Sequence, residues 1–555
     1  MIRCLVLMMW ISVAHAQSIS ISAPTAGQTV SVNVPFNLQV NVTGNVAKVV
    51  YWVDNWSWLG EVTTAPFTLT WTPALSQGTH TLKARAIFGN GASLDAADVS
   101  FVIGEAPVSN NVMKLGTNFW FLASWSGETP FKTGINWATA YSSGADVWNT
   151  TFINELAPYG TLRFMDWGAV NNSNVTTWSQ RRLPTDPLNA DIGLVNPWET
   201  TVLPGLAYEW MIDLCNRTNK DMWVCLPHKT DAEYWSQLAA LIHQKLNAHL
   251  KVYVEYSNET WNGGFAQFQW CLDKGIADGL PGDNQWYKGG AYGMWQSLKI
   301  FKEFQTVFGA PAMGNRVIRV FAASGNYDIA AQAFTNVMQS AGWNQGQRVD
   351  MFAIAPYVGS DIDGNAPNAS SLFHADIDLV FNERILPAET IANNNGVTLG
   401  CYEGGQHLLT NANAWSANPL IYDEYLYMLN KWKPKFNLFM HYAHCGAWSV
   451  DGAWGAKQFT GQTLNSAPKY KALVDWVAMN PPCEATLSVN TTLTGTSVMV
   501  ASQTIVAPPT VPAGQTNLIE SAANITYRAG KSVQLNPGFH ARSGAVFKAL
   551  IGGCN

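Results

Sequence analysis

The sequence predicts a multidomain fold: a central α/β domain, a (β/α)8 TIM barrel, between an N-terminal all-β immunoglobulin-like sandwich and a small C-terminal all-β domain. A chain of 555 residues is too long for one compact core. Strand-like and helix-like segments alternate through residues 112–480, which is typical of a parallel barrel. Residues 17–104 and 481–555 consist instead of short strand-like segments separated by turns.

Residues 1–16 have the pattern of a secretory signal peptide. Arg3 supplies the positive charge, Leu5–Val13 the apolar segment, and Ala14-His15-Ala16 the small-residue cleavage site. No cysteine stands at the cleavage point, which argues against a lipid anchor, and no later segment is long and apolar enough to span a membrane. We therefore expect a secreted, cell-surface or periplasmic protein without membrane insertion.

The composition excludes some partners. The net charge is −6, only 13% of the residues are charged, and there is no basic run, so nucleic acid is a poor candidate. We find no phosphate-binding loop, nucleophile elbow or zinc motif, and expect no cofactor and a monomeric protein. The 25 tryptophans could stack on sugar rings, but tryptophan also fills protein cores.

The segment 17–104 alternates apolar and polar residues in short runs, with turns about every ten residues, as in an immunoglobulin-like sandwich. Trp52, Trp56 and Trp58 could form a sugar-binding surface there, although a spacer role is favoured. Residues 105–111 are predicted to be a linker.

We expect eight barrel strands and a helix at 204–218, which begins with a proline. The strands are predicted at 114–120, 161–166, 221–228, 252–256, 315–322, 349–357, 399–403 and 436–441.

Two of these strands end in a similar way. The segment from Val252 is rich in β-branched and aromatic residues and leads to Glu259, followed by Thr-Trp-Asn-Gly-Gly. The segment 397–405 leads from an apolar run to Glu403, followed by Gly-Gly. Cleavage of a glycoside requires one protonated and one ionised carboxyl group, and two such glutamates would meet at one end of a barrel.

These features resemble the clan A glycoside hydrolases, which are retaining (β/α)8-barrel enzymes. The resemblance implies that Glu259 is the acid/base after strand 4, preceded by Asn258 as in the clan, and that Glu403 is the nucleophile after strand 7. The closest likeness is to uncharacterised secreted bacterial proteins with a Tyr-Ser-Asn-Glu-x-Trp-Asn stretch, so the motif does not bring a substrate with it.

The same resemblance implies substrate-binding residues at other strand ends. Arg163 would keep Glu403 ionised, although it could also, or instead, pair with Glu255 inside the barrel. Asn258 would bind a sugar 2-hydroxyl. The candidates for substrate binding are Arg163, His228, Asn258, Tyr357, Trp448, Trp120, Trp167 and Trp261.

Some of these candidates have structural alternatives. His228 could bind a sugar hydroxyl or serve a structural role. Trp448 follows strand 8, where the clan stacks an aromatic ring on the central sugar, but Trp454 is a second candidate for that position. Trp120, Trp167 and Trp261 could each be core residues, although several tryptophans at one barrel rim suggest sugar subsites.

Cysteines and acidic residues offer little sign of a metal. Asp361-Ile-Asp-Gly-Asn365 has oxygen ligands at calcium-like spacing but lacks the full loop pattern, so we expect no metal. Of the eight cysteines, Cys4 lies in the signal peptide, and Cys483 and Cys554 are the candidate disulfide. The other five are expected to be buried thiols: Cys215, Cys225, Cys271, Cys401 and Cys445.

The residues 481–555 resemble the short stacked-β domain at the C-termini of secreted Bacteroidota proteins, with a second immunoglobulin-like sandwich as the alternative. Together these features predict a secreted retaining glycoside hydrolase that cleaves a β-linked polysaccharide. The first choice of substrate is a plant cell-wall β-1,4-glucan cut internally, as by a cellulase, ahead of mannan, xylan or β-1,3-glucan. The alternatives are a non-catalytic glycan-binding protein or an adhesin built on the same barrel.

Overall fold

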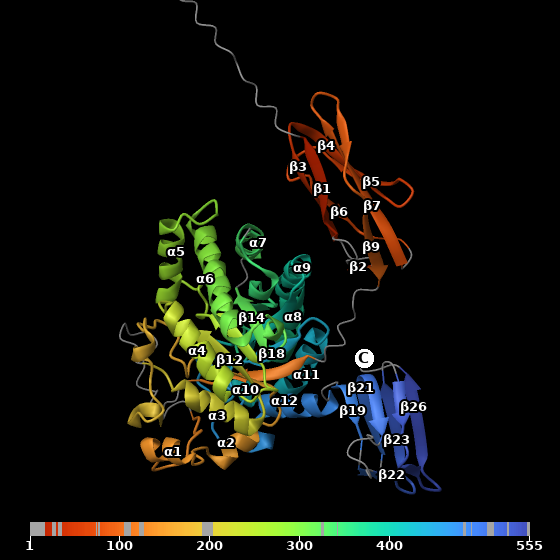
Figure 1. The fold of residues 1–555 in the computed structure, drawn as a ribbon. Coiled ribbons are helices and arrows are strands. Elements are labelled where there is room, and N and C mark those ends of the chain that lie inside the picture. Colours follow the sequence, from red (N-terminus) through yellow and green to blue (C-terminus); the bar gives the residue numbers. More distant parts are fainter. Residues whose placement is uncertain are drawn as a thin grey trace, which may run out of the picture. The chain divides into compact units, whose positions relative to one another are not determined.

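The computed structural model describes most of the chain (Figure 1). The described residues are 17–24, 29–31, 36–73, 75, 78–104, 113–120, 127–190, 204–323, 327–340, 342–480, 484–489, 491–494, 496–507, 516–529 and 532–551. The predicted signal peptide, the predicted linker, and both Cys483 and Cys554 lie outside the described residues. The chain divides into two compact units, residues 1–110 and 111–555. The domain boundaries given above stay predictions.

The N-terminal unit consists of two β-sheets that enclose a core of their own. One sheet has the order β1-β3-β6, and the other has the order β2-β9-β7-β4-β5 with β8 beside β7. Leu38, Val49, Leu82 and Phe101 are fully buried between them, because alternate residues of each strand point inward. This confirms the predicted sandwich. The strands are β1 (Ser18–Ala23), β2 (Thr29–Ser31), β3 (Phe36–Thr43), β4 (Val46–Val53), β5 (Ser57–Val62), β6 (Leu69–Trp71), β7 (Gly78–Phe88), β8 (Ser93–Asp95) and β9 (Val99–Gly104).

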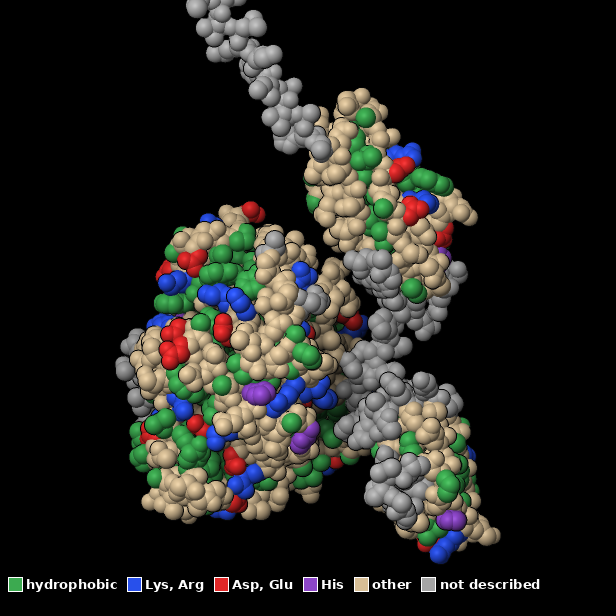
Figure 2. All heavy atoms as spheres, viewed as in Figure 1, with side chains coloured by type: hydrophobic (Ala, Val, Ile, Leu, Met, Phe, Trp, Pro, Cys, Tyr) green, Lys and Arg blue, Asp and Glu red, His purple; other side chains and the backbone are tan. Residues whose placement is uncertain are grey.

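Two indoles of this unit are open to solvent. Trp56 is 50% and Trp58 65% exposed, and the ring of Trp52 meets that of Trp56 edge to face with centroids 5.2 Å apart. Arg85 and Lys83 lie over the same rings, so charged and hydrophobic side chains are neighbours on this surface (Figure 2). A sugar-binding role for these tryptophans stays a prediction.

Eight parallel strands form the predicted barrel of the second unit. They are paired in chain order, and the additional pairing of β15 with β17 closes the ring. The short β16 (Tyr357–Val358) extends the sheet beside β17. The barrel strands are β10 (Lys114–Asn118), β11 (Thr161–Arg163), β12 (Asp221–Leu226), β13 (Val252–Tyr256), β14 (Val317–Ala322), β15 (Met351–Ile354), β17 (Thr398–Gln406) and β18 (Leu438–His441).

Alternation along the strands separates an inner core from an outer one. In β12, Trp223 and Cys225 point into the barrel with Tyr402 and Met440, whereas Val224 packs outward among the helices. Both faces are covered, which explains why these strands read as nearly continuous apolar runs. The strand ends are shorter than predicted in places: β10 stops at Asn118 and β11 at Arg163.

Helices surround the barrel (Figure 1). The predicted helix at 204–218 begins at Tyr208 instead of Pro204, and just before it the backbone N–H of Leu206 donates to the carbonyl of Trp167 at 2.7 Å. Among the described residues, no helix is long and apolar enough to cross a membrane. The helices are α1 (Trp137–Ser143), α2 (Thr150–Glu155), α3 (Tyr208–Thr218), α4 (Ala232–Lys245), α5 (Ala266–Ala277), α6 (Gln285–Phe308), α7 (Tyr327–Ala333), α8 (Ala369–Val380), α9 (Leu386–Asn394), α10 (Ala412–Ala417), α11 (Leu420–Trp432) and α12 (Pro468–Met479).

The C-terminal strands are all-β, as predicted, and every pairing described among them is parallel. Two stacks form, β19-β21-β23-β26 with β24 beside β21, and β20-β22-β25. A second immunoglobulin-like sandwich is therefore the wrong alternative, since that fold is antiparallel. The strands are β19 (Glu484–Ser488), β20 (Thr492–Leu493), β21 (Thr496–Ala507), β22 (Asn517–Ile519), β23 (Asn524–Ala529), β24 (Ser532–Leu535), β25 (Phe539–Ala541) and β26 (Val546–Ile551).

Candidate active site

A buried arginine at the end of β11 is the centre of the site. Arg163 has no exposed surface, and its five N–H groups all have acceptors. Nε and Nη2 donate to the two oxygens of Glu255 at 3.0 and 3.1 Å, and Nη1 donates to Glu403 Oε1 at 2.7 Å. The remaining two N–H groups donate to the side-chain oxygens of Asn118 and Asn258, each at 2.9 Å. Both predicted partners, Glu255 and Glu403, are thus bound at once.

Glu255 lies within the barrel below this end. Besides Arg163, it accepts hydrogen bonds from Trp223 Nε1 at 2.7 Å and from Cys225 Sγ at 3.1 Å. It is 1% exposed, so its charge compensates that of the arginine in a place where an unpaired cation would be very costly. We interpret Glu255 as the residue that fixes the position of Arg163.

Glu403, in β17, has two donors that favour its ionised form. One oxygen accepts from Arg163, and Tyr357 Oη donates to Oε2 at 2.9 Å. Burial raises the pKa of the Glu403 carboxyl above its ordinary value, and the charge and hydrogen bond of Arg163 act in the opposite direction. Tyr357, a predicted substrate-binding residue, is thus bonded to the Glu403 carboxylate, and its contact with a substrate stays a prediction.

Glu259 has a different environment. The backbone at Ser257 and Glu259 is left-handed, with φ of 58° and 42°, so the chain turns sharply as it leaves β13. The Glu259 carboxyl accepts from Asn262 Nδ2 at 2.9 Å and from Tyr402 Oη at 3.3 Å, both neutral donors. Burial, and then the nearby charge of Glu403, raise the pKa of Glu259 to about 8. This raised pKa favours the protonated form of Glu259 at neutral pH.

Asn258 is held on both sides. Its side-chain oxygen accepts from Arg163, and its Nδ2 donates to Asn171 Oδ1 at 3.1 Å. Gln267 extends this chain by donating to Asn171 at 2.7 Å and to the Asn258 carbonyl at 2.8 Å. The network fixes the residue that precedes Glu259, and contact with a sugar hydroxyl stays a prediction.

Four residues of the site were not predicted. Asn118 accepts a hydrogen bond from Arg163, and Tyr402 donates one to Glu259. Asp166 and Tyr442 form a second pair, in which Tyr442 Oη donates to Asp166 Oδ2 at 2.9 Å. Burial and the charge of Glu403 raise the pKa of Asp166 to about 8. The sequence signal that could have identified these four residues is the presence of polar and aromatic side chains near the predicted strand ends.

The aromatic candidates after β18 differ in their contacts. Trp448 Nε1 donates to the Gly455 carbonyl at 2.8 Å, and Lys469 Nζ lies 5.1 Å from the centre of its ring. Trp454 Nε1 donates to His407 Nδ1 at 2.7 Å. The His407 ring in turn contacts the ring of Tyr357, with centroids 4.8 Å apart, so Trp454 is connected to the tyrosine that binds Glu403. Both assignments stay predictions.

Trp167 is a correction to the predicted subsites. It has no exposed surface, and its ring stacks on Phe119 with centroids 4.2 Å apart. A sugar cannot reach it, because the segment after β11 folds back into an aromatic cluster instead of lining the rim. Trp120 contacts Trp454 edge to face at 5.7 Å, and Trp261 is 36% exposed.

His228, beyond the end of β12, is 1% exposed. Neither ring nitrogen has a hydrogen-bond partner among the described residues. Burial, with a smaller effect of Lys229, lowers the pKa of His228 to about 3, so the ring is neutral. Its contact is with the ring of Trp270, edge to face, at 5.8 Å. Hydrogen bonding to a sugar stays a prediction for this residue.

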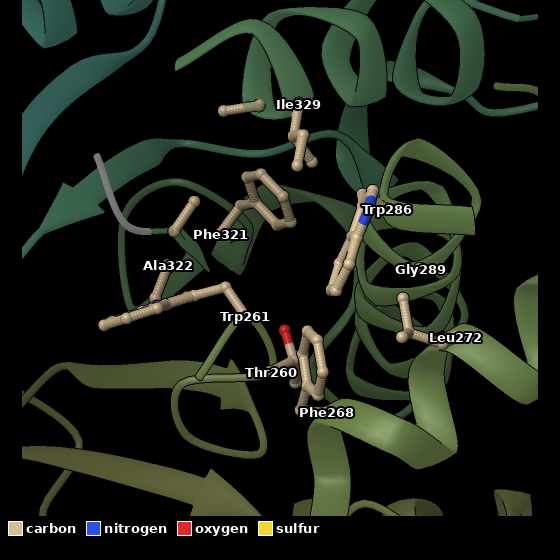
Figure 3. Close-up of a pocket in the computed structure, with 12 residues that line it drawn as sticks. Thr260, Trp261, Phe268, Leu272, Trp286, Gly289, Phe321, Ala322 and Ile329 are labelled. Carbon is tan, nitrogen blue, oxygen red and sulfur yellow. The ribbon is translucent and has the colours of Figure 1, made fainter. Parts of the chain in front are cut away.

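A pocket is lined by the two residues that follow Glu259, by the end of β14 and by the helices α5, α6 and α7 (Figure 3). Its volume is about 300 Å³. Thr260 and Trp261, which directly follow Glu259, contribute to its wall. The full lining is Thr260, Trp261, Phe268, Leu272, Trp286, Gly289, Gly290, Phe321, Ala322, Ala323, Ile329 and Ala330.

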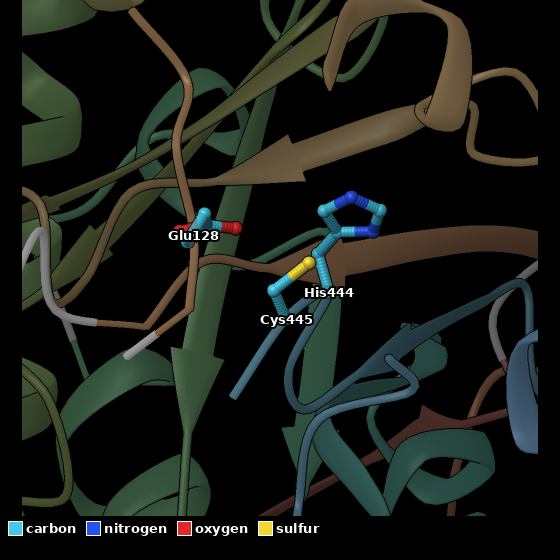
Figure 4. A group of neighbouring side chains, drawn as sticks. All are labelled: Glu128, His444 and Cys445. Carbon is cyan, nitrogen blue, oxygen red and sulfur yellow. The ribbon is translucent and has the colours of Figure 1, made fainter. Parts of the chain in front are cut away.

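Three possible metal ligands meet elsewhere in the described part of the chain (Figure 4). The ligand atoms of Glu128, His444 and Cys445 lie within 4.8 Å of one another, and all three side chains are buried. A positively charged side chain lies nearby, because Lys457 pairs with one oxygen of Glu155. The other oxygen of Glu155 is 3.6 Å from His444 Nε2. Burial raises the pKa of Glu128 well above its usual range. We interpret these side chains as a neutral buried cluster.

The calcium-like segment has internal partners for its central carboxylate. Asp363 Oδ1 accepts from the backbone N–H of Asn365 at 2.9 Å and from Asn411 Nδ2 at 2.8 Å. These bonds connect the loop after β16 to the loop before α10, which is a structural use of the acidic residue. The five cysteines predicted as free thiols are all buried and free.

Comparison with known protein families identifies one part of the chain. Residues 18–84 match the family model described as a bacterial Ig domain. No curated protein matches the chain.

Solved structures resemble parts of the chain. Fibronectin(III)-like modules of Clostridium thermocellum CbhA share 24% identity, covering 16% of this chain and 94% of theirs, with a TM-score of 0.15. An alpha-L-arabinofuranosidase from Thermotoga maritima, in an arabinose complex, shares 11% identity over 66% of this chain and 70% of that chain, with a TM-score of 0.41. A Bacteroidetes-affiliated GH5 cellulase linked with a polysaccharide utilization locus shares 12% identity over 67% and 93%, with a TM-score of 0.37. All three TM-scores are below 0.5, so these similarities assign no activity to the chain.

Proposed function

We propose that this chain is a secreted glycoside hydrolase that cleaves a β-glycosidic bond by retaining double displacement. The observation that carries the proposal is the unequal environment of two carboxyl groups in one barrel, Glu259 just beyond β13 and Glu403 in β17. Glu403 is bound by a cation and a tyrosine, whereas Glu259 has only neutral partners and a pKa of about 8. This difference in partners supports Glu403 as the nucleophile and Glu259 as the acid.

The first step would use both groups together. The Glu403 carboxylate attacks the anomeric carbon, and the bond from that carbon to the leaving oxygen breaks with its electron pair on the oxygen. Glu259 transfers its proton to that oxygen. Arg163 and Tyr357 hold the attacking carboxylate in one orientation, which lowers the entropic cost of reaching the transition state.

The second step would reverse the roles. Glu259, now ionised, accepts a proton from water as the water oxygen attacks the same carbon, and the bond to Glu403 breaks. Glu403 returns as a carboxylate and Glu259 regains its proton. Two displacements at one carbon preserve its configuration.

For the substrate we propose a β-linked polysaccharide, with an internally cut β-1,4-glucan as the first choice. Support comes from the half-buried and exposed indoles of Trp120, Trp261 and Trp454 near the barrel's C-terminal end and from the exposed Trp56 and Trp58 of the accessory unit. Flat aromatic faces of this kind are suited to sugar rings.

The test is release of reducing ends from a panel of polysaccharides, with product sizes measured. We expect activity on at least one β-linked glycan, and loss of it in Glu403→Gln. Glu233→Gln, the same change at an exposed position in the first turn of α4, serves as the matched control and should keep full activity.

Retention of the protein on a glycan without any product would instead favour the non-catalytic alternative. In that case deletion of residues 18–104 separates the two binding hypotheses. Loss of attachment would indicate an adhesin that acts through the N-terminal unit, and continued attachment would indicate binding by the barrel.

A further inference from the structure

The pocket lined by Thr260 and Trp261, which follow Glu259 in the chain, has an unusually apolar wall for a place that would receive sugar. The rings of Phe268, Trp286 and Phe321 surround the space, and Trp261 lies on the side opposite Trp286 (Figure 3). Apart from the N–H groups of the two indoles, the hydroxyl of Thr260 is the polar side-chain group of the lining. A glycosyl unit placed here would bury several hydroxyls with few partners, which costs binding energy for each unpaired group.

The size of the pocket suits an aromatic ring. Its volume is about 300 Å³. A dry apolar cavity of roughly 150 Å³ is enough to bind benzene. Two glycines of α6 allow this helix to pack closely against the neighbouring residues of the pocket. A Cβ atom at Gly290 would lie 2.3 Å from Ile329 Cγ2, and one at Gly289 would lie 2.6 Å from Leu272 Cδ2. Larger residues at these two positions would push α6 away from its neighbours.

The position of the pocket identifies which half of a substrate it faces. Thr260 is bonded to Glu259 in the chain, and Ala322 and Ala323 come from the end of β14, the neighbour of β13. Glu403, by contrast, is in β17 and is bound by residues of β11 and β16. Because Glu259 protonates the leaving oxygen, a group bonded to that oxygen lies on the Glu259 side.

We infer that the pocket binds an apolar, aromatic group carried by the leaving part of the substrate. This inference rests on the proposed function, and it narrows the substrate class. The aromatic group could belong to the alcohol of a simple β-glycoside or to an aromatic ester on the leaving sugar of a glycan, since both present the same flat ring to the pocket.

The experiment compares the 2-phenylethyl and methyl glycosides, whose leaving alcohols have similar acidity, so that a difference in rate between these two does not come from chemical reactivity. For each of several sugars, kcat/KM is measured for the 2-phenylethyl β-glycoside, the methyl β-glycoside and the corresponding disaccharide. A further pair is an oligosaccharide with and without a benzoyl ester on its leaving sugar. We expect a preference of about 10- to 100-fold for the aromatic member of at least one pair, the range given by burial of one aromatic group.

Two variants test whether this pocket causes the preference for aromatic leaving groups. Ala323→Leu fills the space and should bring the ratio of aromatic to non-aromatic rates close to one. Ala277→Leu, the same change at an exposed position at the end of α5, should leave the ratio as it is in the unmodified protein. Binding of 2-phenylethanol alone, followed by tryptophan fluorescence, should weaken in Ala323→Leu as well.

The outcomes distinguish the inference from the proposed function. Hydrolysis of the methyl glycoside or the disaccharide without an aromatic preference would overturn the inference and leave the proposed function standing. An aromatic preference that survives Ala323→Leu would also overturn it, because the group would then bind elsewhere. Binding of 2-phenylethanol to a protein that hydrolyses no glycoside would contradict the proposed function, and the leaving-group role of the pocket with it.

Discussion

Replacing Arg163 with lysine should destabilise the barrel strongly while keeping its charge. Arg163 donates five hydrogen bonds to buried acceptors, and a lysine ammonium has three donors. At least two acceptors would lose a bond to a charged group, each worth about 1.5–3 kcal/mol, so the expected loss is about 3–6 kcal/mol. The acceptors that would lose a bond are among Glu255, Glu403, Asn118 and Asn258, all of which are buried.

Urea unfolding followed by tryptophan fluorescence measures this loss, because Trp223 lies inside the barrel beside Glu255. Arg217→Lys is the matched control: Arg217 pairs with Asp213 on the surface, and its replacement should cost less than about 1 kcal/mol. If Arg163→Lys were as stable as Arg217→Lys, the described network would not be holding this end of the barrel together.

Three further predictions concern activity. Tyr357→Phe removes one donor from Glu403 and should lower kcat about 10- to 100-fold without unfolding the protein, and an unchanged kcat would show that this hydrogen bond does not support the nucleophile. Because the pKa of Glu259 is raised, its proton is present below about pH 8 and lost above it, so kcat/KM for natural substrates should fall above this pH. An equal fall for an activated aryl glycoside, whose leaving group needs no proton, would refute the assignment of Glu259 as the acid. Trp454→Ala should raise KM more than Trp448→Ala, since Trp454 contacts the site through His407; steady-state kinetics showing the reverse order would restore Trp448 as the stacking residue.

The sequence was most informative about the positions of the strands and of the two glutamates. Buried parallel strands have to be apolar on both faces, and the polar residues that interrupt them stand out. Glu259 and Glu403 stood out for this reason, as did Arg163. The prediction of the fold is confirmed, and the roles of these residues stay proposals.

Other features depend on where side chains point, which a linear pattern does not give. Asp166 and Tyr442 were missed because β11 ends earlier than its apolar run, and because the loop after β18 returns toward the site. Trp167 was assigned to the rim because a tryptophan near a strand end has the same sequence pattern whether it faces a cleft or the core. Apart from β21, the described C-terminal strands have six residues or fewer, and such short runs do not tell parallel from antiparallel pairing.

The central claim, that Glu259 and Glu403 have separate roles, is tested most directly by azide rescue of the two alanine variants. An activated aryl β-glycoside is the substrate, and the configuration of the glycosyl azide is determined by nuclear magnetic resonance. In Glu259→Ala the covalent intermediate still forms and azide, which needs no base, should release it as the β-azide. In Glu403→Ala azide should attack the substrate directly and give the α-azide. The α product from Glu259→Ala with the β product from Glu403→Ala would exchange the two roles, and full activity of both variants without azide would show that catalysis takes place elsewhere.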